Sequence, residues 1–138
     1  MSTNIRLYLR TRQNPQYIFN GTHVRTIRLL AAVSFKEPDE WSRPNYAIVD
    51  TGSPTAILPK FIWKPIRIKE IISETTSLYG IGQGSMPARL ARVEMAFLST
   101  RKEIIELTVK AYFAENDSVP LLLGSKTRSP KLASFVIT

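Results

Sequence analysis

Residues 47–59 read AIVDTGSPTAILP, and this stretch decides the fold. Three apolar residues lead into Asp50, and a hydroxyl residue, a glycine and a second hydroxyl residue follow it directly. We expect Ile48 and Val49 to form a buried strand that delivers Asp50 to a tight turn, because β-branched apolar runs are typical of such strands. Gly52 lets the turn close and lets backbone N–H groups approach the carboxylate. A carboxylate held in this way can take a proton from water and return it to a leaving group.

Asp50 also has a purely structural interpretation. Asp, Gly and Ser are ordinary turn residues, so Asp50 could simply cap the junction between a strand and a turn. The apolar residues on both sides of the four-residue motif make a chance match less common. We therefore favour the chemical interpretation.

Length and composition limit the classes of protein that fit this chain. Its 138 residues, 43% of them hydrophobic, suit one domain with a substantial core. The absence of cysteine excludes disulfides and thiolate chemistry, and a single histidine, His23, removes most zinc and Ser-His chemistry. No apolar run approaches the roughly 18 residues of a membrane span. The first residues lack the charged-then-apolar layout of a secretory signal, so a soluble, cytoplasmic protein is expected.

The net charge of +8 is concentrated near the N-terminus. Such a basic arm could meet nucleic acid, an anionic membrane or an acidic partner. Residues 5–10, IRLYLR, also alternate as the solvated strand of a half-buried sheet would. We favour the solvated strand, and nucleic acid is not expected as a partner, because no nucleic-acid fold motif accompanies the charge. We predict a basic extension over residues 1–20 and the main domain over 21–138. Residues 1–36 contain no acid and six basic residues: Arg6, Arg10, Arg12, Arg25, Arg28 and Lys36.

Alternation of apolar and polar residues predicts an all-β protein. Residues 91–97 and 105–113 alternate strictly, so each is expected to be a strand with one buried and one exposed face. No long helical pattern occurs, which leaves at most one short helix. Further strands are predicted at 24–34, 45–50, 66–72 and 118–123 from their β-branched and apolar content. Turns are predicted at Asn20-Gly21, 36–40, Pro59, the glycines at 80, 82 and 84, and 116–117.

Three features follow one another along the chain: the Asp50 loop, the glycine-rich stretch YGIGQGSM at 79–86, and VPLLLG at 119–124. In this order, over about residues 24–124, they resemble the single-domain retropepsin-like (retroviral-type) aspartic proteases. The resemblance implies a small closed, β-barrel-like acid-protease fold. The glycine-rich hairpin would be a mobile flap over the substrate, and the apolar pair before Gly124 would pack beneath the catalytic loop.

The resemblance implies a role for each matching residue. Asp50 would be the catalytic acid, Thr51 would bond across to the opposing loop, and Gly52 would form the turn and donate its N–H. Ser53 would donate to the outer carboxylate oxygen. Tyr79 would enter the flap, although it fits an ordinary strand residue equally well. The flap and substrate-binding residues would be Tyr79, Gly80, Ile81, Gly82, Gln83 and Gly84, and the loop-supporting core would be Leu122, Leu123 and Gly124.

The number of aspartates predicts the quaternary structure, since the implied mechanism uses two facing aspartates and no metal or other cofactor. Besides Asp50 the chain has only Asp39, in a polar insert, and Asp117. Asp117 is followed by Ser118 and Val119, where the turn requires glycine. The second aspartate must therefore come from another copy, in a C₂ homodimer through the Asp50 loop. This dimer would be an aspartic endopeptidase that hydrolyses an extended polypeptide with a water activated between two Asp50 carboxylates.

Two alternatives stay open. The chain could be a catalytically idle retropepsin-like module used for dimerisation or peptide binding. A basic nucleic-acid-binding β domain is the third hypothesis. The segment after Gly124 departs from the family, which continues into a short helix, because residues 125–131 have no apolar position and Pro130 disfavours a helix. Only residues 133–138 remain for a terminal strand, so the dimer interface would be reduced.

Overall fold

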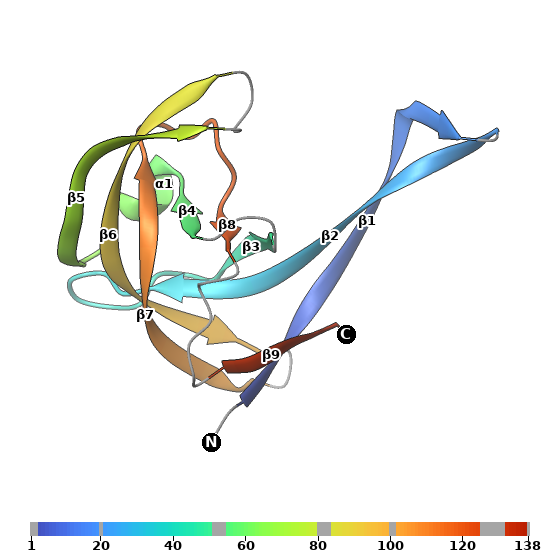
Figure 1. The fold of residues 1–138 in the computed structure, drawn as a ribbon. Helices are drawn as coiled ribbons and strands as arrows, with labels where there is room; N and C mark the ends of the chain where they lie inside the picture. Colours follow the sequence, from blue (N-terminus) through green and yellow to red (C-terminus); the bar gives the residue numbers. More distant parts are fainter. Residues whose placement is uncertain are drawn as a thin grey trace.

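The computed structural model describes residues 3–19, 21–50, 55–79, 84–99, 102–124 and 132–137. These residues form strands joined by short turns, and α1 (Lys60–Trp63) is the helix among them (Figure 1). The all-β prediction with at most one short helix is confirmed at this level. The strands are β1 (Thr3–Phe19), β2 (Thr22–Phe35), β3 (Asn45–Val49), β4 (Ala56–Leu58), β5 (Ile68–Tyr79), β6 (Ser85–Leu98), β7 (Ile104–Ala114), β8 (Leu122–Leu123) and β9 (Leu132–Ile137).

Six of the strands close into a barrel, which agrees at this coarse level with the closed, β-barrel-like fold that the resemblance implied. Their order is β6-β7-β4-β8-β3-β2, and the ring closes because β2 also pairs with β6. Strand β6 makes this possible through its length: it pairs with β7 from Ala88 to Leu98, and its last four residues also pair with β2. The start of β6 pairs instead with β5, which forms a free edge of the sheet.

The core lies inside this barrel and follows the alternation of the strands. On β7 the apolar positions from Ile105 to Phe113 are buried, while Glu106, Thr108 and Lys110 are exposed. Strand β6 likewise buries Val93, Met95 and Phe97. The predicted faces of both strands are therefore confirmed. The main cluster also takes in Ala31, Val33 and Phe35 of β2, Ala47 of β3, and Leu58 of β4.

Two local predictions differ from the structure. The strand predicted over 118–123 is reduced to Leu122–Leu123, because residues 115–119 bend and Pro120 has no N–H for a ladder. Helix α1 follows Pro59, where the sequence predicted only a turn. Of the helical residues that the structure describes, none forms a segment long and apolar enough to cross a membrane. The departure noted for residues 125–131 lies outside the described residues.

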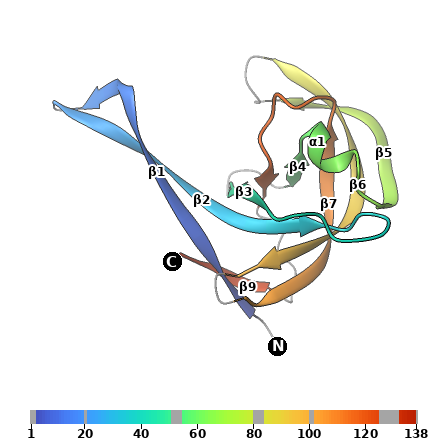
Figure 2. The same ribbon diagram turned by 180° about the vertical axis from the view of Figure 1, so that it is seen from behind.

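Strands β1 and β2 continue beyond the barrel as a two-stranded arm. Both views of the ribbon show this arm extending away from the other strands (Figures 1 and 2). Its antiparallel ladder has a register shift between Gln13 and Ile18. The first residues of β1 also pair in parallel with β9. Residues assigned to an N-terminal extension thus belong to the same sheet as the barrel, and the domain boundary at residue 20 stays a prediction.

Candidate active site

Asp50 lies directly after β3, at the end of a strand that is anchored in the core. Ala47 is fully buried in the main cluster, while Asp50 itself is half-buried. The Asp50 backbone N–H donates to the carbonyl oxygen of Leu123 at 2.9 Å. The backbone N–H of Ile48 donates to the carbonyl oxygen of Leu121, also at 2.9 Å. The backbone that carries the Asp50 carboxylate is therefore fixed to β8.

Strand β8 lies between β3 and β4, the two strands that the Asp50 loop connects. It runs parallel to β3 and antiparallel to β4, and Leu122 is paired with Ile48 on one side and with Ile57 on the other. Leu123 has no exposed surface, and Gly124 is buried. The loop that begins at Asp50 thus starts on one side of β8 and ends on the other, so Leu122 and Leu123 lie beneath both of its ends.

The glycine-rich stretch joins two paired strands. Strands β5 and β6 form a hairpin whose last pair is Tyr79 with Ser85. Gly84 has φ +117°, a conformation that L side chains rarely adopt, although a Cβ there would meet nothing within 4 Å. Glycine is therefore required at this position by the backbone and not by space. Tyr79 is 80% exposed, so in this single copy its ring is available for contact.

A second apolar cluster joins the end of this hairpin to the strands beneath the Asp50 loop. Its buried members are Ile57, Ala114 and Val119. Leu78 and Met86, which face each other across the hairpin, pack against it, as does Leu122 of β8. The hairpin end and the support of the Asp50 loop therefore share one set of contacts.

The other two aspartates lie in different settings. Asp39 is an exposed residue of the turn between β2 and β3. Asp117 accepts a hydrogen bond at 2.7 Å from the backbone N–H of Phe61, in the first turn of α1. Pro59, the residue before this helix, offers no side-chain cap. Asp117 thus caps a helix start from a distant part of the chain, which is a structural role.

Several predicted site residues are not described by the structure. Thr51, Gly52 and Ser53 lie outside the described residues, as do Gly80, Ile81, Gly82 and Gln83. The expectation that Ile48 and Val49 are buried needs correction, because both are half-buried in this single copy. Of the three apolar residues only Ala47 is fully buried, while Val49 packs against the main cluster with part of its surface exposed.

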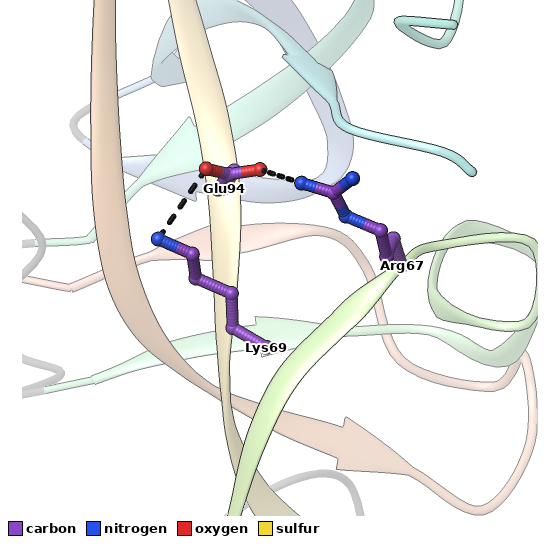
Figure 3. Close-up of polar contacts among 3 residues, drawn as sticks. All are labelled: Arg67, Lys69 and Glu94. Carbon is purple, nitrogen blue, oxygen red and sulfur yellow. Dashed lines mark hydrogen bonds and ion pairs between the residues drawn. The ribbon is translucent and has the colours of Figure 1, made fainter. Parts of the chain in front are cut away.

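A charge cluster links β5 to β6 at the opposite end of the hairpin from Tyr79. The Glu94 carboxylate accepts a hydrogen bond from Arg67 Nη2 at 3.0 Å and lies 3.4 Å from Lys69 Nζ (Figure 3). Arg92 Nε also donates to Glu70 Oε2 at 2.8 Å. Removal of the Glu94 carboxylate from water would by itself raise its pKa, but the hydrogen bonds and charges of Lys69 and then Arg67 outweigh this, so the pKa of Glu94 is lowered from its ordinary value of 4.5.

Substitution of Glu94 by Gln should make the stability of the protein less dependent on acid pH. A lowered folded pKa contributes stability that is present above about pH 4.5 and is lost as the pH falls through the folded value. Because Arg67 and Lys69 are about half exposed, the contribution at pH 7 should be at most about 1 kcal/mol. Urea unfolding of wild type and Glu94→Gln at pH 7 and pH 3 measures it, with Glu106→Gln on β7 as the control for net charge. The account would be contradicted if the free energies of unfolding of wild type and Glu94→Gln differed by the same amount at both pH values.

A groove of about 360 Å³ lies between α1 and strands β5, β6 and β7. Trp63 and Phe113 stack in its wall with ring centroids 5.3 Å apart, and Trp63 Nε1 donates to the carbonyl oxygen of Ala114. Neither Asp50 nor any residue of β3, β4 or β8 lines it. The groove is therefore not part of the candidate active site.

No family model matches this chain, and a comparison with curated proteins finds no similar sequence. The resemblance to aspartic proteases consequently depends on the residues and on their arrangement.

Sequence reasoning missed the second cluster. Ile57, Leu78, Met86 and Val119 belong to four separate segments, and their contact depends on the hairpin folding toward β8. One signal was present: Leu78 directly precedes the glycine-rich stretch and Met86 is its last residue, and a hairpin there pairs them across the two strands.

Proposed function

We propose that this chain is an aspartic endopeptidase that acts as a homodimer, with one Asp50 from each copy. The observation that carries the proposal is the shared cluster that joins the end of the β5–β6 hairpin to the strands beneath Asp50. Asp50 is half-buried, and the β5–β6 hairpin shares an apolar cluster with the strands that support it, which suits an extended peptide held between the hairpin and the Asp50 carboxylate.

The proposed reaction needs two carboxylates that share one proton, since two such groups a few ångströms apart cannot both be ionised. The charged member takes a proton from a bound water, which attacks the carbonyl carbon of the peptide bond. The protonated member donates to the developing oxyanion, which gives a tetrahedral intermediate. The proton taken from water then passes to the departing amine as the C–N bond breaks, and a hydroxyl of the intermediate returns a proton to the other carboxylate. Asp39 and Asp117 do not suit the second role, because Asp39 is in an exposed turn and Asp117 caps α1. The symmetry mate of Asp50 is the remaining source.

The proposed cleft would form between two copies, with one Asp50 loop on each side. A catalytically idle module would share these features. The idle module would differ from the proposed enzyme in that it cleaves no peptide.

Cleavage should depend on protein concentration. Because each active unit contains two copies, the activity per milligram should fall as the protein is diluted below the dimer dissociation constant. The measurement is the cleavage of a peptide library, followed by mass spectrometry over a hundredfold dilution series, with sedimentation velocity on the same samples. Pepstatin, an inhibitor of aspartic proteases, should abolish the cleavage. Cleavage by a species that sediments as a monomer would rule out the shared pair, and a dimer that cleaves nothing would favour the idle module.

A further inference from the structure

The outer face of the β1–β2–β3 sheet brings two arginines and two tyrosines together. The ladder pairs Arg10 with Arg28 and Tyr8 with Leu30, while Ala32 of β2 is paired with Tyr46 of β3. Cross-strand partners share a face, and so do residues two apart on one strand. Arg10, Arg28, Tyr8 and Tyr46 therefore lie on one face of the sheet, which we call the Arg-Tyr face.

This face is directed away from the core. Leu7, Ala31 and Val33, which occupy the alternate positions of β1 and β2, are buried in the main cluster. Arg10 and Arg28 are exposed, and Tyr46 is 55% exposed. The rings of Tyr8 and Tyr46 meet edge to face, with centroids 5.2 Å apart. The cations and the aromatic rings are thus neighbours on one accessible surface.

The pairing of Arg10 with Arg28 is unfavourable in isolation. Cross-strand neighbours have Cβ atoms about 4.5–5.5 Å apart, and like charges directly opposite each other destabilise a sheet. Residues 1–36 contain no acidic residue whose negative charge could offset the two arginines. An anion bound between the two guanidinium groups would remove this repulsion, and arginine suits phosphate because it can donate two parallel hydrogen bonds.

We propose that the Arg-Tyr face binds single-stranded nucleic acid, with Arg10 and Arg28 on phosphates and Tyr46 stacked on a base. Positive charge combined with exposed aromatic rings is the combination that single strands require, because the charge follows the backbone and the rings accept unpaired bases. The arm extends from the barrel, so a strand can approach it without meeting the β5–β6 hairpin (Figures 1 and 2). This pairing of residues depends on the register of the sheet, which the charge of the segment alone does not determine.

A membrane surface is the less suitable polyanion. Insertion into a bilayer surface uses large exposed aliphatic or aromatic side chains beside the cations. Apart from Tyr46 of β3, none of the described side chains of this face is a large exposed hydrophobic residue, and the exposed isoleucines lie on β5 and β7.

Fluorescence anisotropy with a labelled 20-nucleotide dT strand tests the proposal on the full chain. We expect Arg10→Gln/Arg28→Gln to weaken binding about tenfold at 50 mM salt and to reduce the slope of log affinity against log salt by about 1.4, since each phosphate contact on a single strand contributes about 0.7. The same variant should melt at a higher temperature than wild type, because the repulsion is gone. Lys64→Gln/Lys110→Gln, which removes two exposed charges elsewhere, is the control and should leave the affinity within about threefold.

Tyr46→Ala should weaken binding about fivefold or more, whereas Tyr46→Phe, which keeps the ring, should bind as wild type does. Equal effects of the arginine pair and the lysine pair would overturn the proposal. So would equal or tighter binding to a dA·dT duplex of the same length, or binding to vesicles with 30% phosphatidylserine but not to the oligonucleotide. A change from dimer to monomer in sedimentation, with oligonucleotide binding unaltered, would identify the face as a contact between copies and would also overturn it.

Discussion

Asp50→Asn should abolish peptide cleavage while leaving the fold intact. The substitution keeps the shape of the side chain but removes the group that accepts and donates the proton, and general acid–base catalysis contributes about 10²–10⁴-fold to a rate. The backbone hydrogen bond from Asp50 to Leu123 does not depend on the side chain, so the circular dichroism spectrum and melting temperature should change little. The measurement is the initial cleavage rate of the best peptide from the library, over pH 3–8.

Two matched variants control for the loss of a carboxylate. Asp39→Asn alters an exposed turn, and Asp117→Asn retains an oxygen that can accept the hydrogen bond from the Phe61 N–H. Both should cleave at nearly the wild-type rate. Full activity in Asp50→Asn would reject the proposed function outright, and an equal loss in Asp39→Asn would show that the assignment of the acid pair is wrong.

Phe97→Ala should cause the largest loss of stability among the substitutions considered. The Phe97 side chain has no exposed surface, and its residue is paired with Val33 of β2 and with Ile105 of β7, at the point where the barrel closes. Truncation of a buried Phe typically lowers the free energy of unfolding by about 3–5 kcal/mol, since burial is lost and a cavity remains. A domain of this size has a free energy of unfolding of only about 5–15 kcal/mol, so this substitution would remove a large part of it.

Urea unfolding at one fixed protein concentration measures this loss, because a dimer would make stability depend on concentration. Ile104→Ala is the control: it also truncates an apolar side chain to a methyl group, at a position of β7 next to Ile105, where the side chain is 63% exposed. Its unfolding free energy should change by no more than about 0.5 kcal/mol. A loss below about 1 kcal/mol in Phe97→Ala would mean that the barrel does not close tightly at this residue.

Local patterns predicted the central parts and the buried faces of β6 and β7. On β7 the strict alternation from Ile105 to Phe113 predicts both the strand and its buried face, because every position of the run fits the same two-residue period. The hairpin at 79–86 could be predicted because glycines mark the turn and apolar residues flank it. The position of Asp50 at the end of a strand follows from the apolar residues before it and the glycine after it.

The sequence did not predict elements that depend on distant partners. Helix α1 has four residues, and its stabilising contacts come from Asp117 and the carbonyl of Ala114, more than 50 residues away. Strand β8 is only two residues long, and its own composition does not predict it. These residues form a strand because they pair with β3 on one side and with β4 on the other. The opposition of Arg10 and Arg28 depends on how the β1–β2 ladder is aligned, which the composition of residues 1–36 does not determine.

The position of β8 has a consequence for synthesis on the ribosome. Strands β3 and β4 leave the exit tunnel early, but the strand that fills the gap between them is encoded more than 60 residues later. Until Leu123 has emerged, the nascent chain carries two unfinished strand edges, which are open to pairing with other chains. Pairing over such a long sequence separation is intrinsically slow. Chaperone demand during translation should therefore fall once the last residues of β8 have emerged.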